Sequence, residues 1–563
     1  MQSYFRISLF IVSIIFSAAV NAQTKQQGDD IIINALKDEL DRNMKELKLP
    51  EFDKPFFMLY GLQDLRVGSI TATLGSLQHS SMNQQRFKTN TRILVGDYSF
   101  NDESLEDNLY SSPTAIEISL PLEDDYLGIR RAFWSTTDKV YRDAARHFSK
   151  HKETLKESGK ALADLPHRSF AKSEPVRLVN TLERSSFNIT EWETLARNLS
   201  ARFLKHPSIL NSAVMIQFTE GYQYLVSSEG TVARIPITEV NLGVIGQSKN
   251  DDGEFGMDRI IHLGKTPDQL PKEAVLADEI DKMIVRIEAQ TSIPKFADEY
   301  TGPVLFMGGV VAELFSNTLL QGRGEGIFAS DNIPKLKGYQ YDQSSTSMES
   351  KIGKNVVHES ITIKVKPKLK TFQGVDLLGS FDMDDEGIVP ANELVLVENG
   401  VLKTLLNNRT LTNATQTANG FGSGPGVIEV TISQKNTDKV LKEKLLAQAK
   451  KEGLDYAIIV RDEPAFGMGL LNVYKVSVAD GKEELYRQAV IAKLNFKTLK
   501  HILGASDKYQ ALNVSPEANF NQGNRQGMTS YIVPEAVLVE EADVKSFNMP
   551  TLKEENYVSN PLK

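Results

Sequence analysis

The sequence predicts an α+β protein of two domains, in which helices and an antiparallel sheet come first and a β-rich unit, barrel- or sandwich-like, follows. Three observations support this prediction. The chain has 563 residues, more than a single domain of about 150 residues needs. The longest amphipathic helical patterns fall before residue 300, and alternating apolar patterns with turn signals dominate after it. The loop-like composition of residues 291–302 places the boundary between residues 23–299 and residues 300–563.

The first predicted domain alternates helices with strands. Its helical segments repeat apolar residues at helical spacing, and they are residues 32–47, 122–162, 191–203 and 272–290. Its strands are expected to form an antiparallel meander, and they are residues 56–62, 69–77, 91–100, 212–219, 221–228 and 231–246.

The second predicted domain opens with the stretch GPVLFMGGVVAELF at residues 302–315. It reads as a buried strand, a Gly-Gly turn and the start of a helix. The following segments are rich in strand signals, and the Asn399-Gly400 pair carries the signature of a tight hairpin. A helix at residues 437–452 interrupts these strands.

The N-terminus predicts export. Arg6 precedes an apolar run at residues 7–20, and a small-x-small pattern ends at Ala22. We therefore expect residues 1–22 to be a signal peptide and the mature chain to lie in the periplasm or outside the cell; an uncleaved N-terminal anchor is the alternative. No second apolar run of spanning length follows, so no stable membrane span is expected after signal removal.

The composition excludes several classes of function. The chain has no cysteine, which rules out disulfides, a catalytic thiol and thiolate metal sites. The net charge is −9, and no run of Lys and Arg is interleaved with aromatic residues. A nucleic-acid partner is therefore not expected.

Two groups of residues could bind a metal ion. His147 and His151 are spaced i, i+4 on a predicted helix, but no glutamate or third ligand accompanies them, so a solvated helix face is the favoured interpretation. Asp384, Asp385 and Glu386 form a dense acidic turn that could hold a hard cation. The same residues are good turn formers, because their side chains bond nearby backbone N–H groups, and a structural turn is favoured over a metal loop.

Two glycine-rich loops are candidate binding elements. One contains Gly322, Gly324 and Gly326, and the other contains Gly420 and Gly422. Neither loop follows a strand and opens a helix, as a phosphate cradle would, so flexible loops bordering a cleft are the favoured interpretation. The residues alone give no self-evident catalytic set.

Several motifs in the second half occur together in a known order. They are residues 300–306 leading into residues 312–315, the turn at residues 384–387, and residues 398–402 with Arg409 behind them. With them the chain resembles the TldD/PmbA family, the "modulator of gyrase" proteins and their metalloprotease relatives. The first half agrees more loosely, through residues 224–231 and the helix at residues 133–155, which with the signal sequence looks like an exported branch of the family.

The resemblance implies a zinc site that this chain has lost. TldD-type members carry HExxxH on the helix after the opening strand, with a downstream cysteine as third ligand. Aligning the strand ends puts Met307 and Gly308 at the positions of the first His and the Glu, and Ala312 at the position of the second His. No metal residue is carried over, so the resemblance implies a PmbA/TldE-like chain without a cofactor of its own.

Three functions remain open from the sequence. In the first, the chain dimerises with a zinc-bearing TldD-like metalloprotease, or with itself, and forms part of a chamber that threads an unfolded peptide, with the glycine-rich loops at its mouth. In the second, it is a stand-alone peptidase that recruits Asp384, Asp385 and Glu386 with His358 around a different cation. In the third, it is a periplasmic peptide- or glycan-binding protein.

Overall fold

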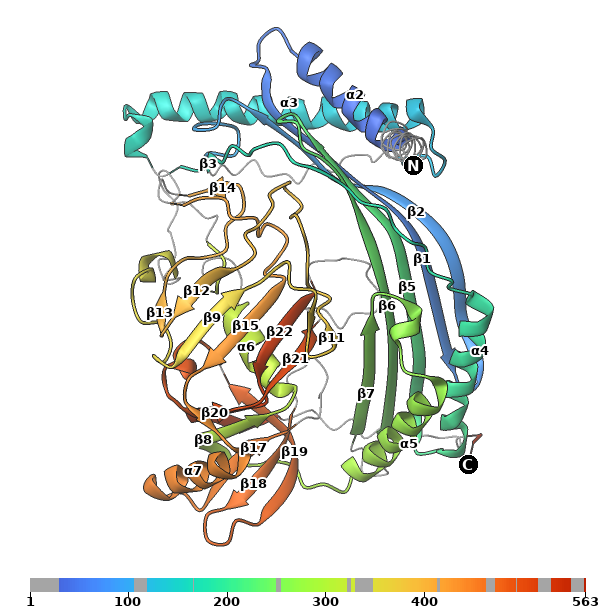
Figure 1. The fold of residues 1–563 in the computed structure, drawn as a ribbon, viewed down its shortest axis with the longest axis vertical. Helices are drawn as coiled ribbons and strands as arrows, with labels where there is room; N and C mark the ends of the chain where they lie inside the picture. Colours follow the sequence, from blue (N-terminus) through green and yellow to red (C-terminus); the bar gives the residue numbers. More distant parts are fainter. Residues whose placement is uncertain are drawn as a thin grey trace, which may run out of the picture.

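The computed structural model describes most of the chain, namely residues 30–105, 119–165, 167–249, 255–320, 326–329, 348–412, 416–461, 471–492, 494–514, 528–547 and 561–562. The expected signal peptide lies outside these ranges. The molecule has two parts, a long curved sheet formed by the first half and a compact β-rich unit formed by the second (Figure 1). This arrangement confirms the α+β class and the order of the two parts.

The first half contains a six-stranded sheet in the order β2-β1-β5-β6, with β4 and β7 both pairing with β6. All of these pairs are antiparallel except β4 with β6. The strands are β1 (Pro55–Thr73), β2 (Ser76–Val95), β4 (Arg177–Val179), β5 (Ile209–Ser227), β6 (Val232–Lys249) and β7 (Phe255–Gly264).

Two of these strands are longer than the sequence predicts. The segments expected as separate strands at residues 56–62 and 69–77 belong to the single strand β1 and the turn after it, and those at residues 212–219 and 221–228 belong to β5. Glycine does not break the ladder here, because it permits close approach of neighbouring backbones. A Cβ at Gly221 would lie 2.0 Å from the carbonyl oxygen of Asp64 on β1.

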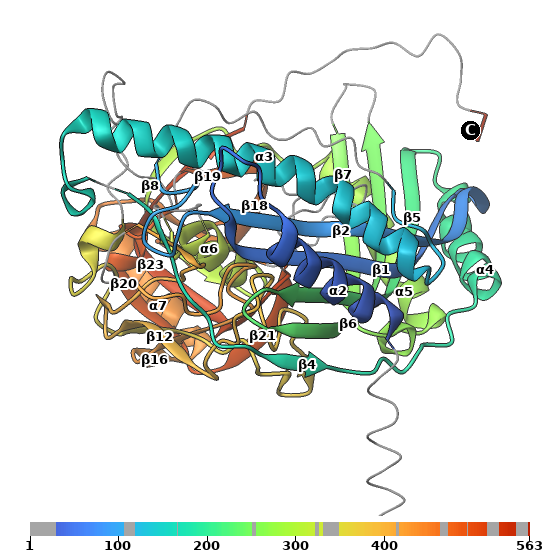
Figure 2. The same cartoon turned by 90° about the horizontal axis from the view of Figure 1, so that it is seen from above.

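Four helices cover one face of this sheet, which we term the outer face. Their apolar stripes pack on strand residues of the same parity, such as Tyr60 under α2 and α3 and Ile70 under α4 and α5. Asp30 and Asp125 cap the first two helices by accepting hydrogen bonds from backbone N–H groups. The helices are α2 (Ile31–Glu46), α3 (Tyr126–Ser158), α4 (Ile189–Ser200) and α5 (Glu273–Gln290). Figure 2 shows α2 and α3 crossing over β1 and β2.

The opposite face of the sheet, which we term the inner face, looks toward the second half. At its upper end, Phe57 and Leu59 of β1 and Leu225 of β5 pack against Met383 of the second half. The two halves are also joined by a two-residue strand pair, β3 (Ser169–Phe170) with β14 (Thr410–Leu411). Figure 1 shows this contact at the top of the second half.

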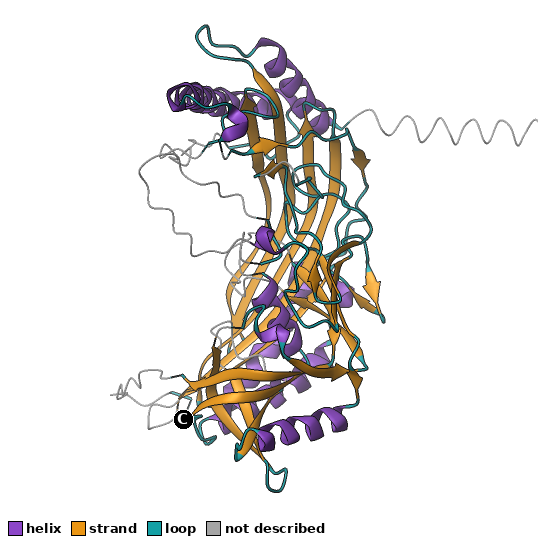
Figure 3. Ribbon diagram, turned by 90° about the vertical axis from the view of Figure 1, so that its left-hand side faces the viewer, coloured by secondary structure: helices purple, strands orange, loops and turns teal. Residues whose placement is uncertain are grey.

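The second half is built from two sheets around one core (Figures 1 and 3). The first sheet runs β13 (Val401–Leu402), β12 (Leu394–Glu398), β9 (Ile361–Val365), β15 (Val427–Ile432), β22 (Thr529–Pro534), β21 (Tyr509–Val514). The second runs β16 (Lys435–Asn436), β20 (Ile502–Ser506), β23 (Ala536–Ser546), β19 (Glu483–Ala492), β18 (Leu471–Ser477), β17 (Tyr456–Val460), β8 (Glu299–Met307). Because β23 also pairs with β8, this second sheet closes on itself. A small hairpin, β10 (Thr371–Phe372) with β11 (Val375–Asp376), completes the set.

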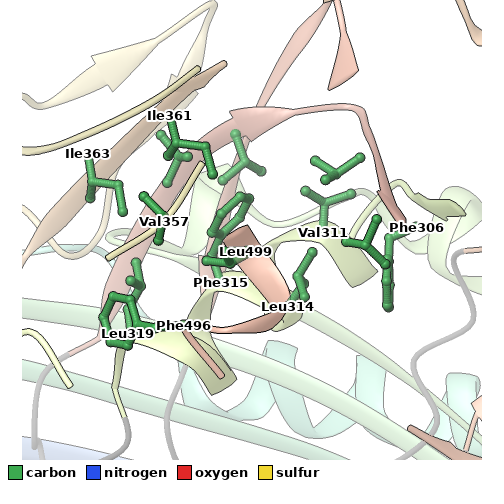
Figure 4. Packing of buried hydrophobic residues seen from close by; sticks show 14 of the residues in the cluster. Phe306, Val311, Leu314, Phe315, Leu319, Val357, Ile361, Ile363, Phe496 and Leu499 are labelled. Carbon is green, nitrogen blue, oxygen red and sulfur yellow. The ribbon is translucent and has the colours of Figure 1, made fainter. Parts of the chain in front are cut away.

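Two helices complete the second half. The helix α6 (Val310–Leu319) follows β8 and lies in the core shared by both sheets, where Leu314 and Phe315 pack among residues of β8 and β9 (Figure 4). The helix α7 (Asp438–Lys451) covers the other side of β8, β17 and β23. Within the described ranges, no helix is both long enough and apolar enough to cross a membrane.

Candidate functional site

The turn between β8 and α6 is the position to which the family resemblance assigns chemistry. Gly308 has a φ of +70°, in the left-handed region that costs a residue with a Cβ about 1–2 kcal/mol. Its N–H donates to the carbonyl oxygen of Glu535 at 2.7 Å, and its own carbonyl accepts from Nε2 of Gln510 at 2.8 Å. The backbone is therefore held in a conformation that suits glycine and disfavours a glutamate.

The structure does not bring the three residues assigned to the zinc position together. Met307 is the last residue of β8, and it packs with the apolar cluster around α7. Phe306 and Ala312 belong to the core around α6 instead. Because successive strand residues point to opposite faces, Met307 and Ala312 lie on different sides of the sheet.

No other register along α6 restores a metal site. The chain has no histidine between His262 and His358, a stretch that includes all of β8 and α6. The one side chain of α6 of a type that ligates zinc is Glu313. It faces the first half of the molecule, where burial lowers the pKa of Arg259 on β7 and the carboxylate of Glu313 opposes that shift. The residues at this position therefore do not fit zinc.

The acidic turn is built around Asp384, whose side chain is 3% exposed. Its Oδ1 accepts from the backbone N–H groups of Glu386 at 3.1 Å and Ile388 at 2.8 Å, and its Oδ2 accepts from the N–H of Gly422 at 3.1 Å. Burial, together with the neighbouring carboxylate of Glu386, raises the pKa of Asp384 to about 7. These bonds are those of a capped turn, the interpretation that the sequence favoured. Asp385, by contrast, is exposed.

Each half of the molecule contributes an arginine that binds a glutamate of the other half. Arg92 of β2 donates to Glu386 Oε1 at 2.6 Å, and Arg409 of the second half donates to Glu229 Oε1 at 2.7 Å. We term these four residues, with Phe170, the clasp. Both guanidinium groups lie over the ring of Phe170, at 4.7 Å for Arg92 and 4.1 Å for Arg409.

The clasp is largely buried and most of its polar groups have partners, although Oε2 of Glu229 is buried with no hydrogen-bond partner among the described residues. Arg409 is 1% exposed, and it also donates to the carbonyl oxygen of Ala171 at 2.9 and 2.6 Å. The second carboxylate oxygen of Glu386 accepts the backbone N–H of Arg409 at 2.6 Å. Arg92 pairs in addition with Glu103 of its own half. Two of the candidate residues thus join the halves, since Glu386 binds both arginines and Asp384 shapes the turn that presents it.

The glycine-rich loops differ in what the structure describes. Gly322 and Gly324 lie outside the described residues. Gly326 is buried and leads into Ile327, whose N–H donates to the carbonyl oxygen of Leu319. In the other loop, a Cβ at Gly420 would lie 2.8 Å from the backbone of Pro390, and one at Gly422 would lie 2.8 Å from Asp385 Oδ1. This loop therefore packs on the acidic turn, and ligand binding by it stays a prediction.

The histidines assemble no site in the described ranges. Within them, no group of three or more His, Cys, Asp or Glu side chains is placed to hold a metal ion, so His358 does not join the acidic turn. Its Nδ1 bonds to Ser360 Oγ at 2.8 Å. His151 is 1% exposed, with Nδ1 at 3.1 Å from the carbonyl oxygen of Asn101. The expectation of a solvated helix face is therefore wrong for His151, which lies on the buried face of α3.

A cavity of about 450 Å³ lies beside the clasp, between the two halves. Its lining comes from the segments around Lys172, Ile388 and Thr417. Lys172 is exposed, and no nucleophile paired with a base is among the lining residues. The cavity therefore offers room for a small group and no arrangement for acyl or phosphoryl transfer.

Sequence reasoning did not find Arg92 or Glu229. They contact the second half through pairs that are 180 or more positions apart along the chain, such as Arg92 and Glu386, whose residue numbers differ by 294. No local pattern marks such a pair. Arg409 was noticed as part of a recurring motif, but its role in joining the halves emerges from the fold.

Comparison with known proteins gives one family and several similar structures. Residues 299–546 match the model of the PmbA/TldA metallopeptidase C-terminal domain. A protein from Methanothermobacter thermautotrophicus named "Metalloprotease" is 43% identical over 67 residues, which cover 12% of this chain and 13% of that protein.

The similar solved structures agree over almost the whole chain at low identity, which shows a shared fold. Two of them are described as putative modulators of DNA gyrase. The one from Thermotoga maritima is 16% identical with a TM-score of 0.51, and the match covers 87% of this chain and 96% of that chain. The one from Bacteroides thetaiotaomicron is 12% identical with a TM-score of 0.55, and the match covers 92% of this chain and 100% of that chain. The third is TldE from Thermococcus kodakarensis, with 13% identity, TM-score 0.51 and coverage of 91% and 100%.

Proposed function

Because this chain belongs to the PmbA/TldD metallopeptidase family, we propose that it is a metal-free subunit that pairs with a zinc-bearing relative and holds peptide for it. One observation carries this proposal. The strand–turn–helix at β8 and α6 is intact, yet no histidine lies anywhere between His262 and His358. The likeness to TldE supports it through the fold alone.

The geometry of the turn favours loss of the metal over its relocation. Gly308 is held left-handed by bonds to Glu535 and Gln510, and Ala312 is 1% exposed in the core. A well-packed turn of this kind keeps the scaffold rigid without any ion. The useful part of the subunit is then its surface, and the hydrolytic groups come from the partner.

The stand-alone peptidase is the less favoured function. It needs the carboxylates of the acidic turn to be available, but Asp384 accepts three backbone hydrogen bonds and Glu386 binds both arginines of the clasp. A metal ion there would have to displace bonds that join the two halves. We also propose, from the N-terminal signal pattern, that the chain and its partner work outside the cytoplasm.

Co-expression with an HExxxH-bearing family member from the same genome tests the pairing. We expect a one-to-one complex by native mass spectrometry, and faster cleavage of an unfolded protein by the complex than by the partner alone. A partner whose HExxxH glutamate is replaced by glutamine is the matched control, and its complex should form without cleavage. Separate chains and an unchanged cleavage rate would contradict the proposal, and a self-dimer without cleavage would favour a binding protein.

A further inference from the structure

The inner face of the first-half sheet carries almost no charge. We term its middle part the central rows: the odd-numbered residues 79–87 of β2, 63–71 of β1, 215–223 of β5 and 235–243 of β6, which lie opposite one another across the paired strands. Only Glu239 among these positions is charged at neutral pH. The others are amide, hydroxyl, aliphatic and glycine residues, with His79, Phe87 and Met215.

On the rows of Asp64 and Arg66 the outer face carries two ion pairs, beside the apolar residues that pack under the helices. Asp64 pairs with Arg86 at 2.9 Å, and Arg66 pairs with Glu220 at 3.2 Å. All four residues lie on β1, β2 and β5, on the face that also carries the helices. Charge is therefore concentrated on the covered side of these strands and nearly excluded from the other side.

The nearly uncharged inner face differs from an ordinary solvated sheet face. A sheet face turned to water is normally polar and charged, while the face under helices is apolar. Here the inward residues are accessible, since Asn83 and Gln85 are exposed, Phe87 is 38% exposed and Thr219 is half-buried. A surface that is open yet uncharged is suited to contact with another molecule.

The side chains of the central rows can both donate and accept hydrogen bonds. Nε2 of Gln63 donates to Oε1 of Gln223 at 2.6 Å, and Nε2 of Gln223 donates to Oγ1 of Thr89 at 3.0 Å. Such amides match the donors and acceptors of a peptide backbone, whatever its sequence.

The position of the central rows relates them to the site described above. The clasp closes the upper end of the inner face, through Arg92 and through Phe170, which packs against Phe57. At the lower end, Arg259 of β7 lies within electrostatic range of Glu313, on the first turns of α6. A ligand lying along the central rows would therefore run between the clasp and the β8–α6 turn.

We propose that the central rows bind an extended, uncharged segment of polypeptide. The proposal rests on the proposed function, because it names the kind of substrate that the subunit holds. A charged segment would lose hydration against a surface whose central rows carry one charged side chain, Glu239, so it binds more weakly. Phe87 is the single aromatic residue of the central rows, so stacking of sugar rings is not what this surface provides.

Binding to synthetic peptides tests this inference on the isolated full chain. The probes are three unstructured peptides of about 15 residues, roughly 50 Å when extended. One contains Gly, Ser, Thr, Gln and Ala, and the other two carry Glu or Lys at every third position. We expect the neutral peptide to bind at least about tenfold more tightly than either charged peptide, measured by fluorescence anisotropy with a neutral dye.

Two substitutions place a cation in the middle of this surface. In Thr219→Lys and in Asn83→Lys, which opposes the same row from the exposed strand β2, we expect weaker binding of the neutral peptide and a new preference for the Glu peptide over the Lys peptide. Thr194→Lys, on the exposed side of α4, is the matched control and should bind like the wild type. If Thr219→Lys does not fold, Asn83→Lys still tests the same row from the exposed strand.

Equal binding of the three peptides, or lysine variants that behave like the control, would overturn the inference. Binding of a neutral glycan in place of the neutral peptide would do the same. The proposed pairing with a metal-bearing relative is tested separately by co-expression. If the complex forms but the three peptides bind equally well, only the proposed role of the central rows is contradicted. If the neutral peptide binds preferentially but no complex forms, only the proposed pairing is contradicted.

Discussion

The β8–α6 turn and the clasp are the two places that invite a functional interpretation, and they differ in what fills them. The turn has the form of a catalytic element, but its surroundings are apolar residues and a left-handed glycine. The clasp has the chemistry of a catalytic centre, with buried carboxylates and guanidinium groups, but each of its four charged residues is paired across the two halves. Both observations support the proposed role as a metal-free subunit.

A dense cluster of charged residues in a sequence does not by itself mark a catalytic site. Asp384, Asp385 and Glu386 stand out in the sequence because they are adjacent, yet adjacency says nothing about their partners. A buried carboxylate that accepts backbone N–H groups shapes a turn, and one that binds an arginine of another domain fixes an interface. The following predictions separate these structural roles from catalytic ones, beginning with the largest expected effect.

Breaking the clasp should have the largest effect on stability. In Arg409→Met, loss of the guanidinium group leaves the buried carboxylate of Glu229 without its arginine partner. Removing one member of a buried ion pair lowers the free energy of unfolding by about 3–5 kcal/mol. Urea unfolding of the purified protein measures it. The matched control is Lys439→Met, whose side chain is 86% exposed, and it should change stability by less than about 0.5 kcal/mol.

The partner substitution makes this test specific. Glu229→Gln should cost less in the Arg409→Met background than in the wild type, because the charge that it removes has already lost its counter-charge. Additive losses would show that the two residues act independently, and an Arg409→Met variant within about 1 kcal/mol of the wild type would contradict the role of the clasp.

The acidic turn should show an intermediate effect that depends on pH. Asp384→Asn removes one acceptor oxygen that faces backbone N–H groups, at a cost of about 1–3 kcal/mol, whereas the exposed Asp385→Asn should be nearly neutral. The folded-state pKa of Asp384, about 7, lies above its unfolded value of about 3.9. The stability that this proton contributes is present below the unfolded value and is lost as the pH rises through the folded value.

The comparison of wild type and variant at two pH values isolates this group. The cost of Asp384→Asn should be larger at pH 5 than at pH 8, because the wild type alone loses the contribution of this proton on going to higher pH. Chemical unfolding at both pH values measures the difference. A cost that grows with pH would show that the ionised carboxylate is the stabilising form.

The turn itself should show the smallest effect. Gly308→Ala forces a side chain into a φ of +70° and should cost about 1–2 kcal/mol. Gly309→Ala is the matched control, because the φ of Gly309 is −59°, and it should be neutral or stabilising by up to about 1 kcal/mol. Thermal unfolding of both variants provides the measurement, and equal costs would mean that the left-handed turn is not what constrains Gly308.

The sequence predicted what local patterns determine. The helices α3, α5 and α7 follow from a 3.6-residue apolar period, and the Asn399-Gly400 hairpin follows from two residues with positive φ. The length of β1 was not predictable, because its continuity depends on neighbouring strands that arrive much later in the chain.

The candidate site was predicted only in part, for a physical reason. Aligning strand ends assigned Met307 and Ala312 to the positions of the first and second histidine, but the alternation of side chains along β8 turns Met307 toward α7 and away from the core of α6. The pairs of the clasp, likewise, depend on how two halves meet, and neither a spacing nor a motif encodes that contact. What did follow from the sequence alone is the lack of histidine and cysteine around the turn.

The most direct measurement is the zinc content of the purified chain together with its cleavage of an unfolded protein, with and without a chelator. A metal-free subunit should contain far less than one zinc per chain and show no cleavage that the chelator abolishes. One tightly held zinc per chain, with chelator-sensitive cleavage by the isolated protein, would contradict the account.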